Sequence, residues 1–396
     1  MINSTFATLV LVLATSTLLG QTFTSHIDLP YAGNTNPRQM LDIHVPNNQT
    51  APTPLIVWIH GGGWQNGNKT LGQNSFQLRY ARNGYAVASL NYRLSSEAIF
   101  PAQAHDTKAA IRWLRANAAT YNIDPTRIGV WGSSAGGHLA ALLGTSNDVV
   151  DLEGSLGVTS QPSRVQAVVD WYGPTDFLLM DTQGQAQGCG PGGHNQATSP
   201  ESLLVGCQIQ TCPTAVQRAN PMAYYTPDDP PFFIQHGSVD CAVPNAQSGI
   251  LNSLMTANGH DVVFQTLIGA GHGGPQFSAE ANLLIVDAFW AAKLRDTVNP
   301  LISSVRTFYK SVDVQSLRAG SLGRFYRFEI TGVNTLAVAK AFVNGVERNV
   351  EIAGNDKVGI YGFPGRVPAT GEVTIQLKTA AGRFSNVIRT PILSNN

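Results

Sequence analysis

The sequence has no excess of charge of either sign, because 25 Lys and Arg residues balance 25 Asp and Glu residues. Only 13% of the residues are charged, and no basic cluster interrupts the chain. Proteins that bind nucleic acid or an anionic membrane surface usually carry such a cluster. The composition therefore argues against a nucleic-acid partner and favours a small, neutral or weakly charged one.

Long hydrophobic runs are also missing. An uncharged apolar run from Phe6 to Leu13 continues weakly to Gly20, which is too short to span a bilayer and has the length of a signal-peptide core. No later segment has the length of a transmembrane helix. We therefore expect a signal peptide over residues 1–20, cleaved after Ser16 or Gly20, and a secreted protein, extracellular or periplasmic. The alternative is a disordered or membrane-adsorbed leader, because no Lys or Arg precedes the run.

Cysteine is scarce, and its four copies fall within one part of the chain, at Cys189, Cys207, Cys212 and Cys241. An even number in an exported protein indicates two disulfides, for which three pairings are possible. Cys207 and Cys212 lack C-x-x-C spacing, and no histidine lies beside them, so a metal site is not expected.

From about Leu55 the chain alternates short apolar runs with amphipathic segments, a pattern typical of parallel sheets built from βαβ units. We expect strands at 54–59, 85–90, 127–132, 165–171, 231–237 and 262–267. Helical spacing predicts helices from Asp106 to Tyr121 and from Gln247, the second with Gly259 as its C-cap, and a last crossover helix at 279–294. The fold class is therefore α/β, with a doubly wound, mostly parallel sheet.

The pattern changes after Thr297–Pro300, where no long amphipathic helix follows. Residues Phe325–Ile330 and Val373–Leu377 alternate apolar with polar, and Val343–Glu347 contains an Asn-Gly hairpin signal. We expect two domains, a large one over residues 21–298 and a small all-β, sandwich-like one over residues 299–396.

The stretch GSSAGG, from Gly132 to Gly137, stands directly after an apolar strand and directly before a helical segment. Gly-x-Ser-x-Gly in this context is a nucleophile elbow, in which a tight turn exposes the serine at a helix N-terminus. The candidate nucleophile is Ser134, because its neighbour Ser133 lacks glycines two positions away on both sides.

A serine nucleophile needs a base and a carboxylate that orients the base, here in the chain order Ser, acid, His. Asp240 follows the strand that ends at Gly237, and His272 follows the next strand in a glycine-rich loop, GAGHGG. We therefore expect Ser134, Asp240 and His272 to form a catalytic triad. Asp170 and Asp176 also follow a strand and are the competing acids.

Three glycines follow the first core strand in VWIHGGGWQNG, residues Val57 to Gly67. Acyl transfer through serine creates an oxyanion, which preorganised backbone N–H donors stabilise. Glycine lets such donors approach closely, so Gly62 and Gly63, together with Ala135 after the nucleophile, are expected to form the oxyanion hole. His60 and Trp64 are expected to hold the loop.

These motifs give the chain from about His26 to Leu294 a resemblance to the α/β-hydrolase fold. Within it, the chain resembles secreted carboxylesterases of the hormone-sensitive-lipase-like type, especially the bacterial feruloyl and acetylxylan esterase group. The resemblance rests on the stretches LDIHVP, HGGGW, SLNYRLS, Phe100–Gly144, Arg218–Pro244 and GAGHGG. It implies an ester hydrolase that needs no cofactor, with Ser134, Asp240 and His272 as the triad.

Substrates implied by this resemblance are short acyl esters or acetylated and feruloylated plant polysaccharide. The cysteine-bearing insertion, residues 188–212, lies where the group varies and is expected to shape the pocket. We expect disulfides to tie it to the loop that holds Asp240. Residues 300–396 resemble an Ig-like TIG module only loosely, and contact with carbohydrate or a surface is one role for them.

Two other functions stay open at this stage. The same triad and oxyanion hole serve a serine amidase or peptidase. From a different class, the chain could be a surface or polysaccharide-binding protein whose hydrolase domain is only a scaffold, although intact triad candidates argue against it.

Overall fold

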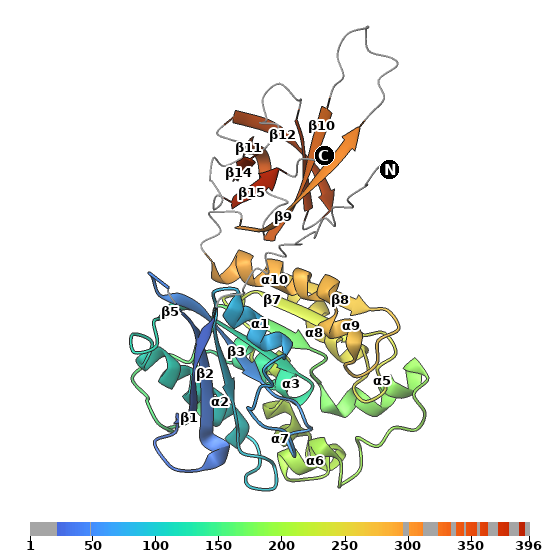
Figure 1. The fold of residues 1–396 in the computed structure, drawn as a ribbon. Coiled ribbons are helices and arrows are strands. Elements are labelled where there is room, and N and C mark those ends of the chain that lie inside the picture. The colour runs from blue at the N-terminus through green and yellow to red at the C-terminus, as the bar shows by residue number, and fades with distance from the viewer. Residues whose placement is uncertain are drawn as a thin grey trace, which may run out of the picture.

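The computed structural model describes residues 22–47 and 49–295, together with the strands of a second sheet between Leu301 and Ile392 (Figure 1). The expected signal peptide over residues 1–20 and the expected linker at 297–300 lie outside the described residues. Among the helices that are described, none combines the length and apolar character needed to cross a membrane.

The first sheet has eight strands in the order β1-β2-β4-β3-β5-β6-β7-β8. Their bounds are β1 (Phe23–Pro30), β2 (Met40–Pro46), β3 (Thr53–Ile59), β4 (Ala86–Leu90), β5 (Ile123–Ser133), β6 (Ala167–Trp171), β7 (Phe232–Gly237) and β8 (Val262–Leu267). From β4 to β8 every neighbouring pair is parallel, whereas β1 and β2 pair antiparallel at one edge. The six expected strands and the mostly parallel α/β sheet are confirmed.

The two antiparallel edge strands were not among the expected strands. In β1 most side chains are exposed or half-buried, so its residues show no apolar run. Its place is determined by pairing with β2, from Phe23 opposite Pro46 to Pro30 opposite Met40. A strand whose stability comes from its partner carries a weak signal in its own sequence.

Helices cover both faces of the sheet (Figure 1). Their bounds are α1 (Phe76–Arg82), α2 (Ala102–Ala116), α3 (Ala135–Thr145), α4 (Val150–Glu153), α5 (Met180–Gln187), α6 (Pro200–Val205), α7 (Pro213–Arg218), α8 (Ala246–Ala257), α9 (Pro275–Ser278) and α10 (Glu280–Leu294). Strand β3 shows how the layers form, because Val57 packs into the core beneath α2, α3 and α8. The next residue, Trp58, packs into the core beneath α1 and α10. Successive side chains of a strand point to opposite faces, so a strand covered on both sides is apolar throughout.

The helix ends show where sequence patterns were reliable. The helix expected to start at Asp106 begins four residues earlier, at Ala102, and ends at Ala116 instead of reaching Tyr121. Gly259 does follow the end of α8 in a left-handed conformation. Backbone bonds from Gly259 to Thr256 and from His260 to Met255 complete a Schellman motif, which satisfies the last carbonyls of α8.

The second sheet has seven strands in the order β15-β14-β11-β12-β13-β10-β9, all antiparallel. Their bounds are β9 (Leu301–Ser311), β10 (Arg324–Val333), β11 (Val338–Val343), β12 (Val346–Gly354), β13 (Lys357–Gly362), β14 (Gly371–Thr379) and β15 (Ile388–Ile392). Val343 pairs with Val346, as the Asn-Gly hairpin signal predicted. The expected β character is thus present in the strands that the structure describes here, and the sandwich-like domain with its boundary between residues 298 and 299 stays a prediction.

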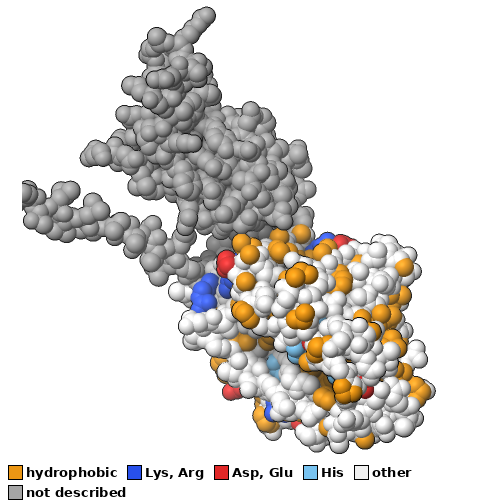
Figure 2. Space-filling view, turned by 90° about the vertical axis from the view of Figure 1, so that its right-hand side faces the viewer, with side chains coloured by type: hydrophobic (Ala, Val, Ile, Leu, Met, Phe, Trp, Pro, Cys, Tyr) orange, Lys and Arg blue, Asp and Glu red, His pale blue; other side chains and the backbone are white. Residues whose placement is uncertain are grey.

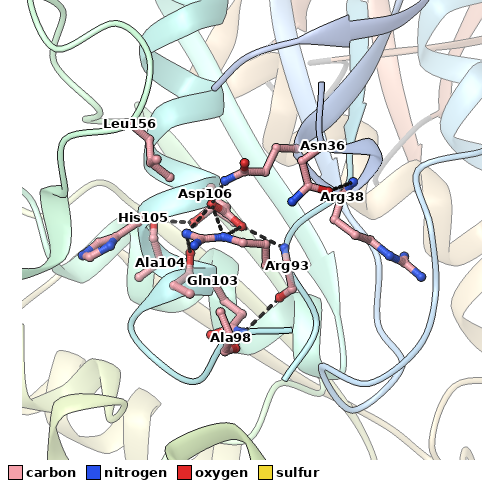
Figure 3. A network of polar contacts seen from close by, with 12 residues as sticks. Asn36, Arg38, Arg93, Ala98, Gln103, Ala104, His105, Asp106 and Leu156 are labelled. Carbon is pink, nitrogen blue, oxygen red and sulfur yellow. Dashed lines mark hydrogen bonds and ion pairs between the residues drawn. The ribbon is translucent and has the colours of Figure 1, made fainter. Parts of the chain in front are cut away.

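A buried ion pair anchors the segment between β4 and α2 (Figure 3). The Asp106 carboxylate, which has no exposed surface, accepts hydrogen bonds from the backbone N–H, Nε and Nη2 of Arg93 at 2.8–2.9 Å. The anchored segment continues to Phe100, whose N–H donates to the carbonyl of Leu204 in α6. The network therefore connects the carboxyl end of β4 to α6, a helix that lines the cavity described below.

Candidate active site

The turn between β5 and α3 places Ser134 at the carboxyl end of the sheet. Ser134 has φ +55° and ψ −124°, a conformation that non-glycine residues rarely adopt. The turn is so tight that a Cβ on Gly132 would lie 2.0 Å from the carbonyl oxygen of Gly136. Such strain persists only where the surrounding structure imposes it, and it often marks a functional residue.

Ser134, His272 and Asp240 are joined by a chain of hydrogen bonds. Nε2 of His272 lies 2.7 Å from Oγ of Ser134, and Nδ1 lies 2.7 Å from Oδ2 of Asp240. An ionised carboxylate only accepts, so Nδ1 must carry the proton and donate. Nε2 of a neutral ring is then an acceptor, oriented to take the proton of the serine hydroxyl. The structure thus brings together the three residues predicted from the sequence.

The Asp240 carboxylate is fully buried and accepts four hydrogen bonds. Oδ1 accepts from the backbone N–H groups of Ala242 and Val243, and Oδ2 from His272 and, at 3.2 Å, from Nε2 of His236. Burial alone would raise the pKa of this carboxyl, but the bonds from His236 and His272 outweigh it and hold the pKa well below its usual range. Asp240 therefore stays ionised beside His272.

His236 is a member of this network that the sequence reading missed. Its Nε2 lies 2.8 Å from the carbonyl oxygen of Val243, and its Nδ1 lies 2.7 Å from Oγ of Ser248. Because both partners of Nε2 are acceptors, that nitrogen must donate. The signal in the sequence was its position, four residues before Asp240 at the end of a buried strand.

The two competing acids have other partners. Oδ1 of Asp170 accepts from the N–H of Gly173, and burial raises the pKa of Asp170 to about 6. Oδ1 of Asp176 accepts from the N–H of Leu178 and caps a short 3₁₀ turn. The geometry favours Asp240 as the partner of His272.

The glycine loop after β3 lies against this turn. A Cβ on Gly61 would lie 2.8 Å from the carbonyl oxygen of Ser133, and Gly62 has φ +110° with Asn66 2.4 Å from its Cβ position. Only glycine fits there, which accounts for the motif. As expected for residues that hold the loop, His60 stacks on Tyr92 at 4.4 Å and Trp64 packs edge-on against His138.

A cavity of about 410 Å³ opens at Ser134 and His272. It is lined by Gly61, Gly62, Gly63, Trp64, Ser133, Ser134, Ala135, Tyr172, Pro174, His194, Pro200, Glu201, Ala242, Val243 and His272. Figure 2 shows histidine side chains within a hollow that hydrophobic side chains border. The three predicted oxyanion-hole residues line this cavity, and the N–H of Ala135 lies in the first turn of α3, where no intrahelical acceptor exists.

Tyr172 is a second residue that sequence reading missed. It follows β6 with φ +44°, and its ring lies 4.8 Å from the His272 ring in an edge-to-face arrangement. Nothing in the local sequence WYG distinguishes it from a core tyrosine. Its position shows that it supports the ring of His272 from the side.

The cysteines form two disulfides, Cys189–Cys241 and Cys207–Cys212, which resolves the three possible pairings. The first joins the insertion to the residue directly after Asp240. Beside it, Nε2 of Gln187 donates to the carbonyl oxygen of Asp240 at 2.7 Å. The expected link between the insertion and the Asp240 loop is present in the structure.

We expect the mature protein to contain no free thiol and to depend unequally on its two disulfides. Closing a 52-residue separation removes more entropy from the unfolded chain than closing one of 5 residues. The Cys189–Cys241 disulfide should contribute about 4 kcal/mol to the unfolding free energy, and the Cys207–Cys212 disulfide about 2 kcal/mol. Urea unfolding of the Cys189→Ser/Cys241→Ser variant should therefore show the larger loss, with Cys207→Ser/Cys212→Ser as the matched control. Four free thiols in a denaturing, non-reducing count would contradict this prediction.

Comparisons with known proteins agree with this architecture. A strained serine between strand and helix, hydrogen-bonded to a histidine that in turn bonds an aspartate at the carboxyl edge of a mostly parallel sheet, defines an α/β-hydrolase. The BD-FAE family model matches residues 41–255, more than half of the chain, and the chain therefore belongs to this family. The predicted resemblance is confirmed at this level.

Among curated proteins, the chain is 32% identical over 240 residues to Esterase LipC of Mycobacterium tuberculosis, covering 60% of this chain and 57% of LipC. It is 31% identical over 251 residues to Esterase LipQ of the same organism, covering 62% of this chain and 56% of LipQ. The chain thus spans little more than half the length of these relatives.

Two solved structures extend the comparison. A truncated form of a carbohydrate esterase from gut microbiota aligns with a TM-score of 0.63 and 36% identity, over 69% of this chain and 97% of that chain. Esterase B from Lactobacillus rhamnosis aligns with a TM-score of 0.54 and 25% identity, over 68% of this chain and 87% of that chain.

Proposed function

We propose that the protein is a secreted serine carboxylesterase that hydrolyses short-chain acyl esters or the acetyl and feruloyl esters of plant polysaccharide. The observation that carries this proposal is the continuous hydrogen-bonded chain from Ser134 through His272 to Asp240, of which Ser134 and His272 line the cavity. Esterases among its relatives and a carbohydrate esterase among its structural neighbours support the same reaction.

Each residue has a defined step in this mechanism. His272 takes the proton from the Ser134 hydroxyl as Oγ attacks the ester carbonyl, and Asp240 stabilises the imidazolium that forms. The N–H groups of Gly62, Gly63 and Ala135 donate to the oxyanion of the tetrahedral intermediate. His272 then protonates the departing alcohol, and water repeats the sequence on the acyl-enzyme to release the acid.

The lining of the cavity supports a neutral substrate. Its ionisable side chains are Tyr172, His194, Glu201 and His272, so no lysine or arginine in the lining would hold a carboxylate or phosphate. The cavity is also bordered by small and apolar groups from Ala242, Val243 and Pro174. A short acyl chain or a flat aromatic acid suits such walls better than an ionic group.

An ester panel tests the proposal directly. The panel contains acetyl, butyryl, octanoyl and feruloyl esters together with acetylated xylan. The protein should hydrolyse acetyl or feruloyl esters faster than octanoyl esters. p-Nitroacetanilide is the matched amide of p-nitrophenyl acetate. Faster cleavage of the anilide than of the ester, or no labelling of Ser134 by an active-site serine probe, would overturn the proposal.

Removal of the second sheet gives a separate prediction. We expect a chain that ends near Asn299 to keep its kcat on p-nitrophenyl acetate, because each residue assigned a role precedes Gly273. The last helix that packs on the first sheet, α10, ends at Leu294, before the truncation point, and buries Trp290. Truncation could expose apolar surface and lower stability, so kcat is normalised to the folded fraction.

The substrate distinguishes the roles of the removed part. If kcat on the soluble ester collapses in well-folded truncated protein, residues 299–396 contribute to the active site and the proposed domain division is wrong. A loss confined to insoluble polysaccharide would assign them a targeting role.

A further inference from the structure

The insertion that carries the cysteines forms one wall of the cavity, through His194, Pro200 and Glu201. This wall lies close to the glycine loop, because a Cβ on Gly63 would lie 3.4 Å from Cβ of Pro200. The insertion therefore places its side chains beside the predicted oxyanion donors.

A carboxylate holds the loop that carries His194. The side chain of Asp181 in α5 accepts hydrogen bonds from the backbone N–H groups of Gly193, His194 and Asn195, each at 2.9 Å. These bonds outweigh burial and lower the pKa of Asp181, so its charge persists. The backbone at His194 is thus fixed before any substrate arrives.

The ring of His194 is held as well. Its Nδ1 lies 3.1 Å from Oε1 of Glu201, a residue that is only 4% exposed. The side chain of His194 lines the cavity and keeps 18% of its surface exposed. Because a carboxylate only accepts, Nδ1 carries a proton, and Nε2 on the opposite side of the ring is left for another partner.

The second oxygen of Glu201 also indicates that His194 and Glu201 form a pair. Oε2 is buried, and within residues 22–295 it has no hydrogen-bond partner. A buried carboxylate of this kind is costly unless a neighbouring positive charge compensates it. Burial lowers the pKa of His194, but its bond to Glu201 and the charges of Glu201 and Asp181 outweigh this and raise it. His194 and Glu201 therefore act as a pair.

We propose that His194 binds a hydroxyl group of the ester substrate through Nε2 and that Glu201 is its positioning residue. This inference rests on the proposed esterase function and narrows its substrates to esters that carry a free hydroxyl. A hydroxyl both donates and accepts, so it pairs with Nε2 whether His194 is neutral or protonated. A carboxylate would pair only with the protonated ring.

Two sources supply such a hydroxyl, the sugar on the alcohol side of the ester and the phenol on the acyl side. Matched substrates separate them. trans-2-Hydroxycyclohexyl acetate and cyclohexyl acetate differ by one hydroxyl on the alcohol, and methyl ferulate and methyl 3-methoxycinnamate differ by one phenolic hydroxyl on the acid. In the full-length protein we expect kcat/KM to favour the hydroxyl-bearing member of one pair by about 10-fold, as for one hydrogen bond.

The variant His194→Phe keeps an aromatic ring but removes both nitrogens, and it should reduce that ratio to about 1. The matched control is His26→Phe on β1, where the ring packs against Tyr121 and lies outside the cavity lining. It should leave the ratio at the wild-type value. A ratio cancels changes that affect both substrates equally, so partial unfolding does not imitate the effect.

Glu201→Gln keeps the shape of the side chain and tests positioning. It should lower the pKa of His194 in an NMR titration. It should decrease the kcat/KM ratio only partly, because the charge of Asp181 still acts on the His194 ring. A ratio near 1 for both pairs in the wild-type protein, or a ratio that His194→Phe leaves unchanged, would overturn the inference while p-nitrophenyl acetate is still hydrolysed. Loss of that hydrolysis in the wild-type protein would instead contradict the proposed function.

Discussion

Replacing Ser134 by alanine is expected to lower kcat/KM for p-nitrophenyl acetate by about 10⁴-fold or more while the protein still folds. Oγ is the atom that would bond to the acyl group, and no other hydroxyl lies 2.7 Å from Nε2 of His272 among the described residues. Circular dichroism and the unfolding midpoint should remain close to those of the wild type, because only one oxygen at the cavity surface is lost from a turn whose backbone is unchanged.

The neighbouring serine is the matched control. Ser133 also lines the cavity, but its hydroxyl is hydrogen-bonded to Tyr172. Ser133→Ala should therefore keep most of the activity. If Ser133→Ala abolishes activity and Ser134→Ala retains it, the nucleophile has been misassigned.

Replacing Asp240 by asparagine is expected to lower kcat by about 10⁴-fold at equal folded fraction. The amide would present an N–H to Nδ1 of His272 and favour the tautomer that carries its proton on Nε2. That tautomer cannot accept the proton of Ser134. Burst kinetics with p-nitrophenyl acetate would show whether acylation is the step that fails.

Asp170→Asn is the control, because Asp170 is equally buried and lies near the carboxyl end of strand β6. Its pKa is raised to about 6 by burial, so a neutral amide suits its surroundings. We expect kcat to change by less than about 10-fold, far less than in the Asp240 variant. A crippling effect of Asp170→Asn or Asp176→Asn, with Asp240→Asn nearly active, would assign the acid differently.

Much of the candidate site could be predicted because its signals are local. The elbow around Ser134 requires glycines two positions away, and each strand that precedes a functional loop is an apolar run. Asp240 and His272 follow successive parallel strands, whose carboxyl ends meet at one edge of the sheet. Chain order alone therefore predicted that the three side chains would meet.

Contacts between segments far apart in sequence were decided by the tertiary structure. Edge strand β1 has no apolar pattern of its own, and Tyr172, which follows β6, supports the ring of His272, which follows β8. Likewise, four cysteines allowed three pairings until folding brought Cys189 and Cys241 to a Cα separation of 5.3 Å.

By itself, the sequence determined the α/β class, the positions of the parallel strands along the chain and the residues at their carboxyl ends, because periodicity and tight-turn sterics act over a few neighbouring residues. Only the tertiary structure decided how the insertion folds back over the site, where Asp181 holds the His194 loop and Glu201 holds its ring. Those bonds depend on how α5 packs against the His194 loop and how α6 packs beside Gly63, and no local pattern specifies contacts between these segments.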